Sequence, residues 1–282
     1  MAETADMVAY RREWVLAFQR KQSLLRATVT TEAMTNGLSA VFAVTGNKSD
    51  TAVTRGINGA IPYQPVTNSQ YTATLVEEHA PYSTTGFNFF KAQADMRMAL
   101  QNQGVATINR AIDSTIITEL GQATQDTGAA TTMSLDLIMK ARTGLLNNQV
   151  ELDGLITCII TPAAEAFMLQ TPEFANSQWT ARTPLTEGQA NPVAGNAYTY
   201  AGIKWIVHNG LPGIGTNAAK CFLYHRSAIG HAIRNGDPQT AANWWDMQDV
   251  YWFRGTVFHG AKLLQNEGVV VINHDDSAYV LS

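Results

Sequence analysis

The chain has 282 residues, of which 45% are hydrophobic and only 15% are charged, and its formal net charge is -4 at pH 7. This length and apolar content exclude a disordered chain and predict a globular protein. No segment is rich in Lys or Arg, which excludes the electrostatic surface of a dedicated nucleic-acid binder. A surface so poor in charge is typical of a protein covered by its neighbours, although a monomer with an uncharged polar surface is an open alternative.

No apolar run is long enough for a signal peptide or a membrane-spanning helix, so the sequence predicts no contact with a membrane. The two cysteines, Cys158 and Cys221, lie in apolar runs that are typical of strands. We expect them to be buried thiols rather than a disulfide, which indicates a reducing compartment.

The first predicted element is an amphipathic helix near the N-terminus. Met7, Trp14, Phe18 and Leu25 recur at near-helical spacing, and residues 28–31 after them are predicted to be extended. The apolar face of this helix packs either on the subunit's own core or on another chain, and its periodicity does not decide between the two.

Residues 46–88 differ in character from the segments on either side. Glycine and proline separate short β-rich runs, one of which is 71–77, and few large apolar side chains are available to form a core. A two-stranded arm with so little hydrophobic surface is marginal in isolation. We therefore predict that this segment lies against something else.

Two helices follow. The longer one is predicted over residues 89–120, with Gly121 at its C-cap and an apolar stripe formed by Met96, Leu100, Ile108, Ile112, Ile116 and Leu120. A stripe that advances in steps of four argues against a coiled coil. The shorter helix is predicted over residues 135–146, with Ser134 as its N-cap and with Leu137, Ile138, Ala141 and Leu145 on its buried face.

The second half of the chain is dominated by strands. An apolar strand at 155–160 stops at Thr161 and Pro162, which open a helix that ends at Leu169. Residues 176–196 are predicted to be a long loop, 210–215 a glycine-rich turn, and 221–224 a strand. Two further strands, 245–262 and 268–273, are joined by a turn at 266–268.

This order of elements resembles the major capsid proteins of tailed bacteriophages with the Hong Kong 97-type fold. In that family a strand that ends in Pro opens a helix, as at Thr161 and Pro162, and a strand that starts at Gly and ends at Leu-Pro or Val-Pro comes later, as at 202–212. A second family pattern, an Arg followed by Gly-Ala and then by Gly-Val-Val, appears here as Arg254, Gly260, Ala261, Gly268, Val269, Val270 and Ile272.

The resemblance implies an α+β subunit divided into four parts. Residues 1–45 would be an N-terminal arm and 46–88 an extended β-hairpin loop. A peripheral domain with a long spine helix would comprise 89–132 and 244–282, and a central axial domain would comprise 133–243. The candidate intersubunit contacts on the arm and the loop are Trp14, Phe18, Arg55, Tyr63 and Tyr71.

The function implied by the resemblance is that of a coat protein in the virion. Copies of the chain would assemble in the host cytoplasm into pentamers and hexamers, which form an icosahedral head around double-stranded DNA held without sequence specificity. Separate scaffolding, portal and decoration proteins would be its other partners. An encapsulin-like nanocompartment shell is the alternative within the fold. No lysine occurs between Ser49 and Phe90, so the Lys–Asn cross-link of some shells is not expected.

Enzyme signatures such as G-x-S-x-G, a Walker loop or H-E-x-x-H are missing, and we predict no catalytic residue, cofactor or metal ligand. Residues 77–79 and 274–276 carry acidic and histidine side chains, but adjacent strand residues point to opposite faces, which disfavours a metal site. The aromatic residues in 244–253 are predicted to be core or interface. A hydrolase with Ser, His and Asp from separate segments is the alternative from another class.

Overall fold

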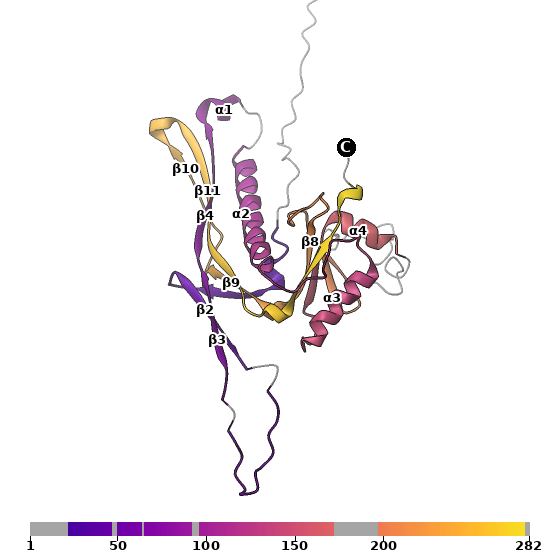
Figure 1. The fold of residues 1–282 in the computed structure, drawn as a ribbon. Coiled ribbons are helices and arrows are strands. Elements are labelled where there is room, and N and C mark those ends of the chain that lie inside the picture. The colour runs from indigo at the N-terminus through magenta and orange to yellow at the C-terminus, as the bar shows by residue number, and fades with distance from the viewer. Residues whose placement is uncertain (1–21, 47–49, 64, 92–95, 172–196, 280–282) are drawn as a thin grey trace, which may run out of the picture.

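A computed structural model describes residues 22–46, 50–63, 65–91, 96–171 and 197–279, which form two five-stranded sheets and a two-stranded sheet (Figure 1). The first sheet has the order β1-β9-β11-β10, and β4 also pairs with β11. Its strands are β1 (Thr30–Met34), β4 (Val76–Thr85), β9 (Ile229–Arg234), β10 (Gln239–Trp245) and β11 (Val250–Leu263). Because β11 pairs with β4, β9 and β10, it organises this sheet.

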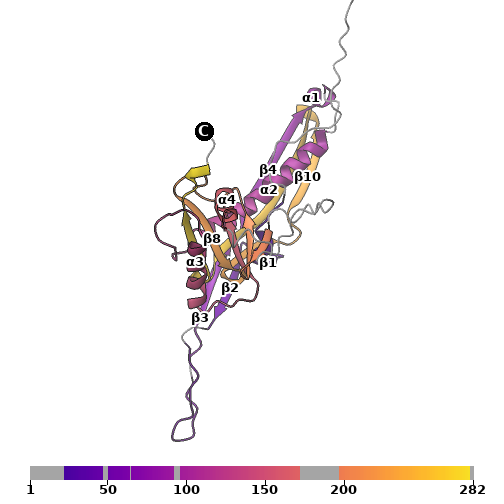
Figure 2. The same ribbon diagram turned by 90° about the vertical axis from the view of Figure 1, so that its right-hand side faces the viewer.

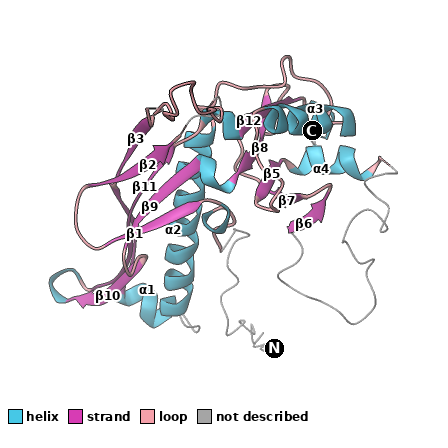
Figure 3. Ribbon diagram, turned by 90° about the horizontal axis from the view of Figure 1, so that it is seen from below, coloured by secondary structure: helices cyan, strands magenta, loops and turns pink. Residues whose placement is uncertain are grey.

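The long helix α2 (Met96–Leu120) packs on one face of the first sheet (Figure 3). Ile108, Ile112, Ile116 and Leu120 of the predicted stripe are buried, and Leu100 is half-buried. The helix and the sheet approach closely at Gly104, where an added Cβ would lie 2.1 Å from the ring of Phe253. Glycine therefore allows this helix to contact β11 directly.

The second sheet has the order β12-β8-β5-β7-β6. Its strands are β5 (Ile156–Ile160), β6 (Ala197–Tyr200), β7 (Ile203–Val207), β8 (Ala219–His225) and β12 (Val269–His274). Every residue of β5 is buried, as expected for a central strand rich in β-branched side chains. The helices α3 (Leu135–Asn147) and α4 (Pro162–Leu169) lie beside this sheet (Figure 1).

The caps of these two helices confirm the sequence-based boundaries. The Ser134 hydroxyl accepts a hydrogen bond from the Leu137 amide, and the Thr161 hydroxyl accepts one from the Ala164 amide. Pro162 occupies the first turn of α4, where its missing N–H costs nothing. The predicted inner face of α3 is buried at all four positions, Leu137, Ile138, Ala141 and Leu145.

The two-stranded sheet is formed by β2 (Ser39–Thr45) and β3 (Asn68–Thr74), and the chain between them extends far from the rest of the subunit (Figure 2). Small side chains attach its root to the first sheet, because Ala40, Ala73 and Ala232 pack together there. At Gly260 an added Cβ would lie 2.1 Å from the carbonyl oxygen of Thr74. The hairpin and β11 thus touch backbone to backbone.

The strand pairing differs from the expected division at three places. The predicted strand 71–77 is broken at Leu75, whose amide donates to Leu38, and 76–85 belongs to the first sheet rather than to the loop. Residues 30–34 and 39–45, expected in the arm, are β1 and β2 of the subunit's own sheets. The alternating burial of β4, with Ala80 and Tyr82 facing inwards, explains why it pairs with β11.

The third difference is that β12 joins the second sheet, whereas the sequence placed 244–282 in one domain. The run 269–272 is apolar and buried at every position, which suits a strand that pairs with β8 along its edge and packs against α3. Conversely, β9 and β10, expected in the axial domain, pair with β11 in the first sheet.

The predicted helices also shift at their ends. The long helix is preceded by α1 (Gly86–Lys91), and residues 92–95 lie outside the described residues. Most of the predicted N-terminal helix and the predicted loop at 176–196 also fall outside them. Leu25, expected at the end of that helix, instead precedes a 3₁₀ turn, η1 (Arg26–Thr28).

Candidate subunit interface

The segment between β2 and β3, residues 46–67, is the loop on which the sequence analysis placed intersubunit contacts. Its root is closed by a hydrogen bond from the Gly46 amide to the Thr67 carbonyl oxygen, at 2.9 Å. Its tip is a turn in which the Gly56 amide donates to the Ala60 carbonyl oxygen. Gly59 in this turn has a φ of 76°, a left-handed conformation that favours glycine.

The loop exposes its apolar side chains. Val53, Ile57, Ile61, Tyr63 and Val66 are between 41% and 107% exposed, and none of them belongs to a hydrophobic cluster of the described residues. Single exposed apolar residues are common on protein surfaces, but this loop exposes five within residues 53–66. The described part of the loop therefore has an exposed apolar surface that another chain can cover.

The structure separates the five candidate contact residues. Trp14 and Phe18 lie outside the described residues. Arg55 and Tyr63 are exposed on the loop, where a second chain can reach them. Tyr71 is half-buried on β3 opposite Phe42, and the ring of Phe42 lies against Gly230, so Tyr71 belongs to the root of the hairpin.

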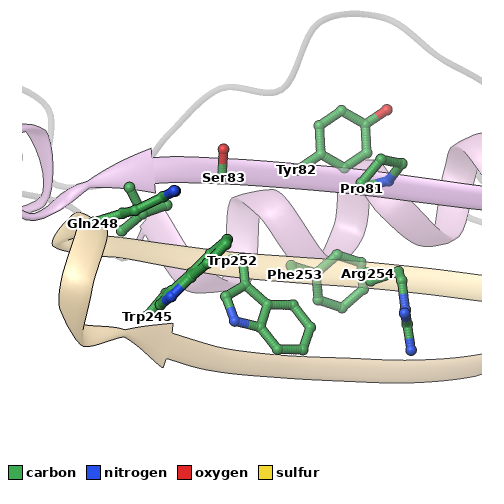
Figure 4. A pocket seen from close by; sticks show the side chains of 9 residues that line it. Pro81, Tyr82, Ser83, Trp245, Gln248, Trp252, Phe253 and Arg254 are labelled. Carbon is green, nitrogen blue, oxygen red and sulfur yellow. The ribbon is translucent and has the colours of Figure 1, made fainter.

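A second exposed surface, whose aromatic residues the sequence left open between core and interface, lies on the face of the first sheet opposite α2. Tyr251 and Phe253 point towards the helix and are buried, so Trp252 and Arg254 point the other way. Together with Trp245 on β10 they line a hollow of about 540 Å³ (Figure 4). We call this face, bearing Trp245, Trp252 and Arg254, the open face.

The open face continues along β11 into a smaller hollow of about 150 Å³ that also includes Arg254. There the guanidinium of Arg234 lies 3.9 Å above the ring of Phe258 and pairs with Asp237 at 2.6 Å. Trp and Arg are the residues most enriched where protein partners bind. Adjacent strand residues point to opposite faces, so the run of three aromatic residues at 251–253 places at least one of them on the face away from α2.

The acidic and histidine side chains of 274–276, weighed above as a metal site, include two that are buried in the core. His274 and Asp276 are fully buried and 2.9 Å apart, and the Thr161 hydroxyl donates to the same carboxylate at 2.7 Å. Thr161 also caps α4, so this cluster ties the C-terminal segment to the second sheet. No solvent reaches its hydroxyl, since Thr161 is 0% exposed. The cluster therefore lacks the accessible nucleophile that a hydrolase requires.

The cysteines are likewise core residues. Cys158 and Cys221 are free and buried, as predicted. Burial raises the pKa of Cys158 well above its usual range and raises the pKa of Cys221 to about 12. Because the thiolate is the reactive form, neither thiol is suited to nucleophilic chemistry.

Within the described ranges, no group of three or more His, Cys, Asp or Glu side chains is placed to hold a metal ion. His79 instead pairs with Glu77 at 2.9 Å and with the Thr256 hydroxyl at 3.0 Å. No helix in this described part of the chain combines the length and the apolar character needed to cross a bilayer.

The buried His231 introduces a dependence on pH. The rings of His231 on β9 and His259 on β11 are 5.7 Å apart, and neither ring nitrogen of His231 has a hydrogen-bond partner among the described residues. Burial lowers the pKa of His231 to about 4, and the nearby charges of His259 and Arg26 add to this effect. The folded subunit therefore keeps His231 neutral where an unfolded chain would protonate it.

We expect the free energy of unfolding of dissociated subunits to fall by about 2 kcal/mol through His231 between pH 7 and pH 5. The pKa of His231 is lower in the folded state, about 4 against an ordinary 6.5, so the unfolded state binds the proton first as the pH falls. Denaturant titrations at several pH values measure this slope. His231→Leu is expected to flatten it, and an unchanged slope in this variant would contradict the assignment.

Comparisons with known proteins agree with this geometry. The family model described as "Phage capsid protein" matches residues 2–276. The structure of Mycobacterium phage Che8 matches with a TM-score of 0.72 and 15% identity, covering 96% of this chain and 98% of that one. The capsid of the native GTA particle matches with a TM-score of 0.71 and 12% identity, covering 97% of both chains.

A third match is the capsid structure of the cyanophage P-SCSP1u, with a TM-score of 0.70 and 14% identity over 96% of this chain and 93% of that one. Among curated proteins, none matches the sequence. The structural matches confirm the Hong Kong 97-type fold predicted from the order of elements. Since the family model spans nearly the whole sequence, the chain belongs to the phage capsid protein family.

Proposed function

We propose that this capsid protein is the major coat subunit of a phage head, and that its copies form the pentamers and hexamers of an icosahedral shell. The observation that carries the proposal is the projecting loop 46–67, whose exposed apolar side chains join no hydrophobic cluster among the residues that the structure describes. Burying such side chains on a neighbour contributes roughly 25 cal/mol per Å² of apolar surface. A closed shell repeats each modest contact many times, which makes assembly cooperative.

The contacts are assigned to three regions. Arg55 and Tyr63 on the loop meet a neighbouring subunit, Tyr71 supports the root of the hairpin at that contact, and Trp14 and Phe18 bind another copy through the N-terminal arm. The open face, with its exposed Trp245, is a further contact surface. The first sheet with α2 serves as the peripheral domain and the second sheet with α3 and α4 as the axial domain.

The remaining partners follow from the role of a container. The chain has a net charge of -4 and no block of basic residues, so its shell encloses double-stranded DNA without sequence-specific binding. Scaffolding, portal and decoration proteins are separate chains in this proposal, and the head assembles in the host cytoplasm. The subunit performs no catalysis, which accords with the buried state of Thr161, Cys158 and Cys221.

We expect the purified chain to form capsomers or closed particles rather than to stay at its monomer mass of 30.7 kDa. Analytical ultracentrifugation over a range of salt and protein concentrations, followed by electron microscopy of the heavy fractions, measures this outcome. Particles that fill with DNA in infected cells support the phage head, whereas particles that retain a cargo enzyme support a nanocompartment. A monomer under every condition would contradict the proposal.

A further inference from the structure

A single buried carboxylate joins three distant parts of the chain. Asp113 lies in the middle of α2 and is 0% exposed. One of its oxygens accepts the Ser23 hydroxyl at 2.5 Å and the Leu25 amide at 3.2 Å, and the other accepts the Leu24 amide at 3.1 Å. Asp113 therefore binds the chain at the point where the described residues begin.

The same carboxylate contacts the second sheet through His208, the residue that follows β7. The His208 Nε2 atom lies 3.4 Å from Asp113, and the imidazole is 1% exposed. The Nδ1 atom of His208 accepts the Gly210 amide at 3.0 Å, so the ring proton of the neutral form is carried by Nε2 and is directed at Asp113. The two sheets are thus connected at this carboxylate.

Residues 23–34, which begin at the contact with Asp113, make contacts with both sheets. The Thr28 and Tyr224 hydroxyls share a 2.5 Å hydrogen bond on the second sheet, and β1 then pairs in parallel with β9 of the first sheet. Leu25 and Val29 are completely buried along the way. Figure 1 shows this indigo segment beside α2, between the two sheets.

We propose that Asp113 is the positioning residue that fixes where the N-terminal arm leaves the subunit, and that it links the arm to both sheets. The inference rests on the proposed role of residues 1–21 as an intersubunit arm. An arm that binds a neighbour continues into Ser23 and Leu24, which are hydrogen-bonded to Asp113. Through this carboxylate the start of the arm is held to α2 and to His208. A buried carboxylate is suited to this task because charge-assisted hydrogen bonds are roughly twice as strong as neutral ones.

The first test measures hydrogen exchange at Leu24 and Leu25 in the full chain carrying Asp113→Asn. Asparagine keeps one acceptor oxygen and replaces the other with an NH2 group that cannot accept, so exchange at the amide that loses its acceptor is expected to rise at least ten-fold. Glu119→Gln is the matched control, because it neutralises a carboxylate of the same helix that binds the Leu263 amide instead. If Asp113→Asn does not fold, Ser23→Ala replaces it, with an expected rise of about three-fold. Unchanged exchange in the variant that folds would overturn the anchor.

The second test separates positioning from general support of the fold. The Trp14→Ser, Phe18→Ser double variant is expected to lower the particle yield about ten-fold. If Asp113 acts through the arm, adding Asp113→Asn to this double variant lowers the yield little further. If Asp113→Asn lowers the particle yield by the same factor in the wild-type chain and in the double variant, Asp113 only supports the fold, and its positioning role is overturned. A double variant that assembles normally would instead refute the arm contact in the proposed function, while the exchange result still decides the anchor.

Discussion

Subunits in which residues 50–66 are replaced by a short Gly-Ser linker are expected to fold normally and to form no closed particles. The deletion removes the exposed apolar side chains of the loop but keeps both strands of the hairpin, β2 and β3. Because the removed segment supplies nothing to the buried clusters, the free energy of unfolding should change by less than about 1 kcal/mol. Particle yield, measured by sedimentation, should fall by orders of magnitude.

The Ile57→Ser, Tyr63→Ser double variant is the finer probe of the same contact. It keeps the length of the loop and removes two fully exposed apolar side chains, so its effect on the isolated subunit should be negligible. A drop in particle yield in this variant locates the contact at these side chains. Loss of cooperative thermal unfolding in the deletion would show that the loop supports the monomer instead.

Replacing Gly260 with Ala is expected to destabilise the subunit by about 4 kcal/mol, at the upper end of the range for single substitutions. The new Cβ would lie 2.1 Å from the backbone oxygen of Thr74, and a backbone cannot move aside as a flexible side chain can. The root of the hairpin must therefore separate from β11. Denaturant unfolding of dissociated subunits measures the loss.

Gly144→Ala provides the opposite control. Gly144 lies inside α3, and its nearest neighbour to an added Cβ is a Val270 methyl at 3.8 Å, an ordinary contact. Since alanine is favoured over glycine inside a helix, this variant should gain up to about 1 kcal/mol. Equal effects at the two positions would show that the close approach at Gly260 does not constrain the fold.

The sequence predicted best the elements whose signals are local. Ser134 and Thr161 mark helix starts by their own hydrogen bonds, and the buried face of α3 follows from spacing alone. For Gly260 the sequence showed only a match to a family pattern. The reason that glycine is needed there could not be predicted, because the oxygen that excludes a side chain belongs to the distant residue Thr74.

Pairing between distant segments could not be predicted in the same way. Nothing local distinguishes 76–85 as a partner of β11, or 269–274 as a partner of β8, since both choices depend on which faces are already covered. Asp113 was missed because one acidic residue in a helix carries no signal until Ser23 and His208 are placed beside it. The open face was left undecided between core and interface, because an aromatic residue such as Trp252 is typical of both.

The pairing of β11 also sets an order of events during synthesis. Strands β4, β9 and β10 all depend on it, although β11 occupies residues 250–263 near the end of the chain. β9 and β10 lie close to β11 in sequence, whereas β4 lies at residues 76–85, and contacts between residues so far apart in sequence form late and slow folding. A chain that lacks β11 therefore cannot join β4, β9 and β10 into the first sheet, and the root of its hairpin lacks the contact with Gly260.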